Sequence, residues 1–314
     1  MLSKVNFVIA DRKAFLKQNP EVDDINKAEL FINSEMAWIY QTYLHLYDFS
    51  ASYSNKPKVG FINIIHANDY VNLKNKSKYY CVTVLADKKV YFPSESNIVQ
   101  NADMLYNKKY TYLYHWPQKN IKKRDVTKTF SNRLRVAFFG EKENSIDLSF
   151  FNNNKIEVIQ KKNWIDYSDV DCVIAIRDFK RTFPEKPSTK LVNSWLGDCL
   201  FISANDSAYQ QIGFPGFDYI KCTSLSDVKE NLQFYSDNRE QSELIRANSR
   251  LKLEFYNEKS VKACWVRFLV EEHYKFGVWG ERPRYYKIKS VFLGLVRYNF
   301  LRLKRRLFMI MNRY

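Results

Sequence analysis

Residues 185–209 read EKPSTKLVNSWLGDCLFISANDSAY and hold a helix-length stretch, a strand-length apolar run and the start of a second helix. Pro187 suits the first turn of a helix, where its missing N–H costs nothing, and Gly197 suits the end of that helix. CLFIS (199–203) is typical of a buried strand. The stretch therefore predicts one repeat of a parallel sheet covered by helices.

The same alternation occurs on both sides of a polar segment, PQKNIKKRDVTKTFSNR (117–133), which has no periodicity and is the candidate linker. Before this segment, strand-like runs occur at 4–9, 59–65, 79–87, 96–101 and 111–116, and a helical stretch occurs at 26–49. After it, strand-like runs occur at 134–140, 155–160, 171–176, 199–203 and 218–222. We expect an α/β protein with two Rossmann-like halves. Neither half contains G-x-G-x-x-G, so a dinucleotide fingerprint is absent.

Composition indicates a folded globular chain, with 314 residues, 46% hydrophobic residues and only 8 Gly and 8 Pro. The five cysteines are scattered through apolar runs, and we interpret them as reduced core residues of a cytoplasmic protein. The four histidines lack metal-ligand spacing, so we expect no metal and no cofactor. The first apolar run resembles a strand rather than a signal peptide, and no run is long enough to span a membrane.

Basic residues follow the strand ends of the second half. Arg177 follows DCVIAI, Lys186 stands at the entrance of the next helix, and Lys190 lies one turn inside it. Asp206 and Ser207 are natural N-caps of the following helix. Cations and helix N-termini at one sheet edge suit a pyrophosphate, and Asp206 could accept ribose hydroxyls. The alternative is that the lysines are solvated, Asp206 only caps a helix and Arg177 makes a surface ion pair.

The segment KPSTKLVNSWLGDCLFISANDSAY resembles the donor-site signature of GT-B glycosyltransferases, in which K-P-x-x-K-L opens one helix and an E-S-A-Y-like turn opens the next. Similar segments are AWIYQTYLHL (37–46), NIVQN (97–101), HWPQ (115–118) and DCVIAIRD (171–178). The resemblance covers about 35–270. Asp206 stands where these enzymes usually have Glu, and Leu85 stands where Arg is expected before Ala-Asp, which weakens any role for Asp87.

The resemblance implies a GT-B fold with an acceptor domain at 1–125, a nucleotide-sugar donor domain at 126–275 and a tail at 276–314. Lys190 and Arg177 would neutralise the diphosphate, the N–H groups of Ser207 and Ala208 would contact it, and Asp206 would hold the ribose. The implied donor-binding set is Arg177, Lys186, Lys190, Asp206, Ser207, Ala208 and Tyr209. Such enzymes need no metal.

His66 and Asp69 are the candidate catalytic residues of the first half. They follow the strand-like run VGFINII, where a general base for an acceptor hydroxyl could lie. A single histidine after a strand can equally be structural. Asp169 and Asp171 form a D-x-D pattern typical of metal sites in the other large glycosyltransferase fold, but they precede a strand, at the wrong end for a ligand.

Residues 281–314 contain ten basic residues and one acid, which accounts for +9 of the formal net charge of +16. Drawn as a helix, this tail has an apolar face with Arg297, Arg302, Lys304, Arg305 and Arg313 off it. The apolar face consists of Ile288, Phe292, Leu295, Val296, Phe300, Leu303, Leu307 and Ile310. This pattern favours an interfacial helix on an anionic membrane. The helix could instead pack on the body or on another subunit, or bind nucleic acid.

We therefore expect a metal-independent glycosyltransferase that moves a sugar, by default from a UDP-sugar, to a lipid-linked bacterial surface glycan such as O-antigen. It would be cytoplasmic and peripheral on the inner face of the plasma membrane, with no nucleic-acid partner. The alternatives are a noncatalytic protein that binds anionic surfaces or nucleic acid through the +16 charge, and a nucleotide-sugar epimerase of the same fold.

Overall fold

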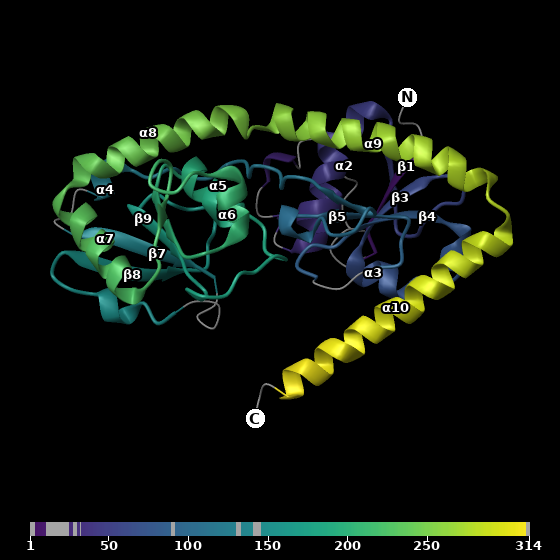
Figure 1. The fold of residues 1–314 in the computed structure, drawn as a ribbon. Coiled ribbons are helices and arrows are strands. Elements are labelled where there is room, and N and C mark those ends of the chain that lie inside the picture. Colours follow the sequence, from purple (N-terminus) through teal and green to yellow (C-terminus); the bar gives the residue numbers. More distant parts are fainter. Residues whose placement is uncertain are drawn as a thin grey trace. The chain divides into compact units, whose positions relative to one another are not determined.

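The computed structural model describes residues 4–10, 25–27, 30–31, 33–88, 92–129, 133–140 and 146–311. The chain forms two compact units, which we call the first unit (Met1–Tyr114 with Val261–Tyr314) and the second unit (His115–Ser260) (Figure 1). The first unit therefore contains both the N-terminal residues and the C-terminal helices.

The first unit is built on a parallel sheet of six strands in the order β2-β1-β3-β4-β5-β6. The strands are β1 (Val5–Val8), β2 (Ser52–Ser54), β3 (Ile62–His66), β4 (Tyr80–Val84), β5 (Ser96–Val99) and β6 (Tyr110–Tyr112). β1, β3, β4 and β5 are buried throughout. The runs predicted as strands all form strands. β2 was not predicted, because Ser-Tyr-Ser has no apolar run.

Apart from the last two, which lie near the C-terminus, the described helices of the first unit are short. They are η3 (Met36–Tyr40, a π-helix), α2 (Gln41–His45), η4 (Tyr47–Phe49), α3 (Ala67–Asn72), η5 (Lys76–Lys78), η6 (Ala102–Met104), α9 (Glu258–Glu281, which begins in the second unit) and α10 (Arg284–Met311). The predicted continuous helix over 26–49 was wrong in its extent. Among the described residues, 25–26 and 30 have 3-10 geometry, and 27, 31 and 33 are not helical. α-Helical backbone begins at 34–35 and changes to π, back to α and then to 3-10 geometry before Ser50, which is left-handed with φ 60°.

The second unit has a parallel sheet of five strands in the order β11-β10-β9-β7-β8. The strands are β7 (Leu134–Phe139), β8 (Ile156–Lys161), β9 (Cys172–Ala175), β10 (Leu200–Ser203) and β11 (Ile220–Lys221), and the helices are α4 (Val126–Thr129), η8 (Ser149–Phe151), α5 (Thr189–Leu196), α6 (Ser207–Ile212), α7 (Leu225–Asp237) and α8 (Arg239–Phe255). The core includes Val136, Ile174 and Ile202 from the central strands and Val228 and Leu232 from α7.

Both sheets use the same strand order when their strands are counted along the chain, 2-1-3-4-5, with a sixth strand added in the first unit. This confirms the α/β prediction of two Rossmann-like sheets. The order reverses direction between β1 and β3 and between β7 and β9. Ligands of such sheets bind outside the carboxyl ends of the strands at this reversal.

The start of α5 differs from the prediction. The helix begins at Thr189 with Ser188 at the N-cap, so Pro187 precedes the helix instead of occupying its first turn. The amide of Lys186 donates to the carbonyl of Phe183 at 2.9 Å, which closes a separate turn just before the helix. Gly197 ends α5 as predicted, and a Cβ there would lie 2.6 Å from the ring of Tyr167.

Candidate functional site

A buried ion pair joins the loops that follow β9 and β10. Arg177 Nη1 lies 2.7 Å from Asp206 Oδ2, and the two side chains are only 18% and 5% exposed. The pair forms because β9 and β10 are parallel neighbours, so their carboxyl ends present both residues at one edge. The alternative of a surface ion pair at Arg177 is therefore wrong, because its partner is buried.

Lys190 lies in the first turn of α5 and reaches the end of β7. Its Nζ is 4.3 Å from the ring centroid of Phe138, and a Cβ on Gly140 would be 3.6 Å from it. The pKa of the Lys190 amine is lowered to about 7, mainly by burial and also by the nearby Arg177 cation, while Asp206 opposes the shift. A partly buried amine with this pKa is poised to gain a proton when an anion arrives.

Asp206 occupies the N-cap position of α6, but its side chain makes no capping hydrogen bond. Oδ2 is used by Arg177, whereas Oδ1 is buried without a hydrogen-bond partner among the described residues. Burial raises the pKa of Asp206, and Arg177 opposes that shift. The alternative in which Asp206 serves only as a cap is therefore wrong, and Oδ1 is available to accept a hydroxyl.

The remaining predicted donor residues surround this pair. Ser207, Ala208 and Tyr209 form the first turn of α6, and the Tyr209 ring packs edge-on against Phe201 at 5.0 Å. Burial raises the pKa of the Tyr209 phenol to about 12, so it stays protonated beside Arg177. The charge of Lys186 is close enough to contribute to the lowered pKa of Lys190. The structure thus brings the predicted cations and Asp206 into one cluster.

Two residues of this cluster were missed by sequence reasoning. Glu185 is buried, and its charge contributes to the raised pKa of Asp206, so the cluster contains a second carboxylate. Gly140 directly follows β7 with φ 135°, a conformation that disfavours a side chain, and lies beside Lys190. In the sequence, Glu185 could have been noticed as an acid next to Lys186, and Gly140 as a glycine immediately after a predicted strand.

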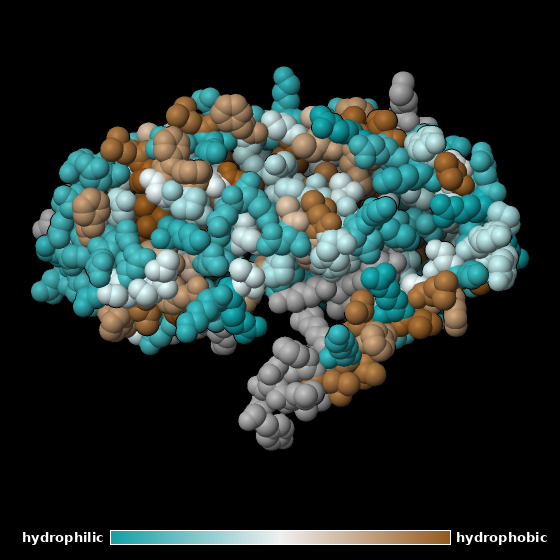
Figure 2. All heavy atoms as spheres, viewed as in Figure 1, coloured by the Kyte–Doolittle hydropathy of each residue, from teal (hydrophilic) through white to brown (hydrophobic). Residues whose placement is uncertain are grey.

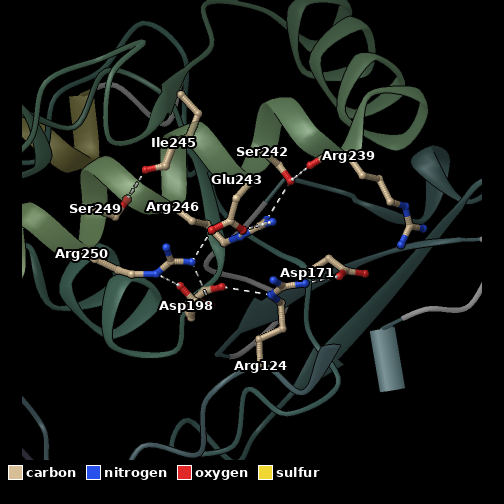
Figure 3. Close-up of polar contacts among 10 residues, drawn as sticks. All are labelled: Arg124, Asp171, Asp198, Arg239, Ser242, Glu243, Ile245, Arg246, Ser249 and Arg250. Atoms are coloured by element: carbon tan, nitrogen blue, oxygen red, sulfur yellow. Dashed lines mark hydrogen bonds and ion pairs between the residues drawn. The ribbon is translucent and has the colours of Figure 1, made fainter. Parts of the chain in front are cut away.

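Arginines anchor the end of α5 that lies away from Lys190 (Figure 3). Asp198 follows this end with φ 58°, and its carbonyl accepts from Arg124 Nε at 3.2 Å. Its carboxylate accepts from Arg250 Nε of α8 at 2.9 Å, and Arg250 also contacts Glu243 at 2.5 Å. These contacts fix the helix that presents Lys190 to the site.

The D-x-D pattern lies at the amino end of β9, as expected. Asp171 Oδ1 is 3.5 Å from Arg124 Nη1 (Figure 3). Asp171 Oδ2 accepts from the amide of Arg135. Asp169 forms an ion pair with Lys161. Both carboxylates are therefore engaged by cations of the protein.

His66 and Asp69 lie in the first unit, at the carboxyl end of β3. His66 Nδ1 accepts from the amide of Asn68 at 3.3 Å and so caps α3, and Nε2 lies 3.1 Å from Ser34 Oγ. The accepting Nδ1 places the ring proton on Nε2. Burial lowers the pKa of His66 to about 4, with a smaller effect of Lys88, so the ring is neutral at pH 7. Asp69 lies in the first turn of α3 and is partly exposed.

No protein-family model and no curated protein sequence matches the chain. Solved structures do match. Anabaena HepE in complex with UDP-glucose has a TM-score of 0.53 at 10% identity, covering 85% of this chain and 99% of HepE. TarM has a TM-score of 0.52 at 9% identity, covering 72% of this chain and 57% of TarM. HepE in complex with UDP and glucose has a TM-score of 0.51 at 9% identity, covering 66% and 78%. These similarities show that the chain has the GT-B glycosyltransferase fold.

Proposed function

We propose that the chain is a glycosyltransferase that uses a nucleotide-sugar donor, with a UDP-sugar as the default. The observation that carries the proposal is the cluster of Arg177, Lys190 and Asp206 at the β7/β9 reversal of a GT-B sheet. The HepE structures with UDP and UDP-glucose support the choice of nucleotide. The donor site then lies in the second unit.

In this proposal the cluster stabilises the leaving group. Lys190 and Arg177, assisted by Lys186, neutralise the diphosphate, while the N–H groups of Ser207 and Ala208 donate to it. Asp206 Oδ1, which is buried without a hydrogen-bond partner among the described residues, accepts from a ribose hydroxyl. Because charge builds on the diphosphate as the sugar leaves, fixed cations there raise the rate as well as the affinity.

The acceptor hydroxyl must lose a proton, and we propose Asp69 or His66 of the first unit for this role. To act as the base, His66 would have to release Nδ1, its unprotonated nitrogen, from the amide of Asn68. A base must lie within hydrogen-bond reach of the hydroxyl, and both residues lie at the carboxyl end of β3, at the strand reversal of their sheet. His66→Asn and Asp69→Asn separate the candidates. The base variant should lose transfer rate while binding UDP normally, whereas loss of UDP binding would contradict a role in proton transfer.

A thermal-shift series with UDP, UDP-glucose, ADP and GDP tests donor binding, because a ligand of the native state raises its stability. Lys190→Ala should lower transfer at least roughly tenfold with the fold intact, since a charge-assisted contact to the diphosphate is lost. Lys180→Ala is the matched control, because Lys180 is exposed on the loop that leads from β9 into α5. Near-normal transfer by Lys190→Ala would contradict the proposed site.

Turnover separates this function from its alternatives. A noncatalytic binding protein would show salt-dependent binding to anionic surfaces without consuming nucleotide sugar. An epimerase would convert the nucleotide sugar without any acceptor. Release of UDP that requires a glycan acceptor contradicts both.

We also propose that the acceptor is a lipid-linked bacterial surface glycan such as O-antigen and that α10 contacts the inner face of the plasma membrane. Gly294, Tyr298 and Leu301 pack α10 on the first unit: a Cβ on Gly294 would lie 2.3 Å from Pro93, and the Tyr298 ring lies 5.3 Å from that of Phe92. Phe292 and Phe300, on the opposite side of the helix, are exposed. One side of α10 thus packs on the body, and the exposed opposite side supports the docking proposal.

Exposed apolar side chains gather along the described part of α10, with hydrophilic ones between them (Figure 2). Those at helical spacing are Ile288, Phe292, Val296, Phe300, Leu303 and Leu307, and Leu293 is exposed next to them. Exposed Arg297, Arg302 and Lys304 stand beside them, a composition suited to an anionic bilayer surface. The side chains of Arg305 and Ile310, and all of Arg313, lie outside the described residues. None of the described helices is long and apolar enough to cross a bilayer.

Co-sedimentation with vesicles containing phosphatidylglycerol tests the docking of α10. Phe300→Asp should reduce binding several-fold, because it places a charge in the inserted face. Phe255→Asp on α8 is the control, since Phe255 is 78% exposed and Phe300 is 65% exposed. Equal binding by the two variants would contradict the docking proposal, and a variant lacking residues 281–314 should bind least.

A further inference from the structure

A pocket of about 300 Å³ opens in the first unit where α9 ends and α10 begins. It lies at the amino ends of the strands, the edge opposite His66, because Tyr80 starts β4 and Lys109 immediately precedes β6. Its lining includes Tyr80, Glu95, Lys109, Lys275, Trp279 and Arg282. The pocket takes no part in the donor site of the second unit.

Cations outnumber carboxylates around this pocket. Lys109 Nζ donates to the carbonyl of Ser94 at 3.1 Å, a neutral group that does not offset the charge of the lysine. Arg282 Nη1 is 3.8 Å from Glu95 Oε2, and its side chain is half exposed. Lys275 Nζ is 2.6 Å from the buried Glu272 Oε1. Three cations therefore face two carboxylates, and one of those ion pairs is loose.

The surroundings of the pocket have the composition of a membrane interface. Tyr274, Tyr285 and Tyr286 are exposed at the α9–α10 junction. Lys287 Nζ lies 4.1 Å from the ring centroid of Trp279. Trp and Tyr side chains gather at the headgroup level of bilayers, where Lys and Arg attract anionic lipid. The apolar face of α10 begins immediately beyond this corner.

We propose that this pocket binds the phosphate of an anionic phospholipid headgroup and fixes the start of α10 at the lipid surface. The inference rests on the membrane contact of the proposed function. The oxygens of a phosphate diester can accept hydrogen bonds from Lys109 and Arg282 at the same time. The negative charge of the phosphate would offset the excess of cations around the pocket. The loose contact of Arg282 with Glu95 leaves the guanidinium able to turn toward the headgroup.

The test compares two double variants of equal charge. Lys109→Ala/Arg282→Ala removes two pocket cations, whereas Lys108→Ala/Arg284→Ala removes two exposed cations one and two residues away. Binding is measured with vesicles of phosphatidylglycerol mixed with phosphatidylcholine and with phosphatidylcholine alone. The pocket variant should bind the anionic vesicles at least roughly fivefold more weakly than the control variant, by the usual effect of a cation near such a surface. Ser290→Phe, which fills the pocket without changing charge, should have the same direction of effect.

Each result has a defined meaning. If the two double variants bind anionic vesicles equally and unfold at the same temperature, the pocket does not bind the headgroup. That conclusion holds even if Phe300→Asp reduces vesicle binding as expected. Stabilisation of the wild type by glycerol 1-phosphate or inorganic phosphate, without any vesicle preference, overturns the lipid as its ligand. Absence of vesicle binding by the wild type also overturns it. The UDP thermal shift reports on the donor site separately, because no pocket residue belongs to the second unit.

Discussion

Lys190 couples the proposed donor site to pH. Its pKa is lowered to about 7, so the amine is about half protonated at neutral pH. A diphosphate favours the protonated form, so binding takes up a proton and affinity falls as pH rises. We expect UDP affinity to fall roughly fivefold between pH 7 and pH 8, as linkage requires for such a group.

Calorimetric titration in buffers of different ionisation enthalpy measures this proton uptake. Lys190→Arg is the control, because a guanidinium stays charged over this range and should bind without the pH dependence. An unchanged affinity of the wild type between pH 7 and pH 8 would show that Lys190 does not face the diphosphate.

The burial of Asp218 should make the free energy of unfolding depend on pH in the acidic range. Its carboxylate is fully buried, accepts from the amide of Phe214 at 3.0 Å and lies 4.0 Å from Lys252 Nζ. Burial raises its pKa from 3.8 to about 6. The folded state therefore binds the proton more tightly than the unfolded state does, and this contribution to stability is lost as pH rises from about 4 to about 6.

Asp218→Asn should abolish that pH dependence and raise the free energy of unfolding at pH 7 by up to about 3 kcal/mol. Urea unfolding at pH 4.5, 6 and 7.5 measures it, with the exposed Asp103→Asn as control. Asp103→Asn should keep the wild-type dependence of stability on pH. The explanation fails if Asp218→Asn keeps it as well.

At the scale of elements, a buried carboxylate holds α9 against its sheet. Glu272 accepts from the Tyr80 hydroxyl at 2.9 Å, from Ser96 Oγ at 2.8 Å and from Lys275 Nζ at 2.6 Å. Tyr80 and Ser96 begin β4 and β5, so one side chain ties the helix to two strands. Glu272→Ala should cost about 3 kcal/mol, because it leaves the buried hydroxyls unsatisfied.

Denaturant unfolding compares this variant with Glu271→Ala, which removes the exposed neighbour and should stay within about 0.5 kcal/mol of the wild type. Glu272→Gln should be milder than Glu272→Ala, because the amide oxygen still accepts a hydrogen bond. Equal losses at positions 271 and 272 would mean that the buried contacts contribute nothing.

The strands were predictable because parallel strands buried on both faces appear as short continuous apolar runs, as CVIA (172–175) and LFIS (200–203) do. β2 is only half-buried and lacks that signal. The helix over 26–49 could not be bounded from its apolar spacing, since a change from π to α geometry leaves no mark in local propensity.

The convergence of Arg177, Lys190 and Asp206 could be predicted, because residues after neighbouring parallel strands share one edge. The contact of Lys190 with Phe138 and the pairing of Arg177 with Asp206 depend on tertiary packing and could not be. The anchoring of α5 through Asp198 was also hidden, since its partners lie far away in the sequence.

At the scale of the whole molecule, the two sheets share a strand order but differ in what their carboxyl edges offer. The edge of the second unit carries Arg177 and Lys190, suited to a diphosphate. The edge of the first unit carries the neutral His66 with both ring nitrogens engaged. The proposed donor should therefore stabilise mainly the second unit.

Hydrogen exchange measured by mass spectrometry, with and without saturating UDP, tests whether the donor stabilises mainly the second unit. We expect the largest added protection in peptides spanning β10 and the start of α6, and around β7, because the ligand binds the native state of that edge. Peptides of β3 and β4 should change less. Lys190→Ala should reduce the protection, while Lys180→Ala should keep it. Dominant protection in the first unit would move the donor site to the other sheet and contradict the assignment of Arg177, Lys190 and Asp206.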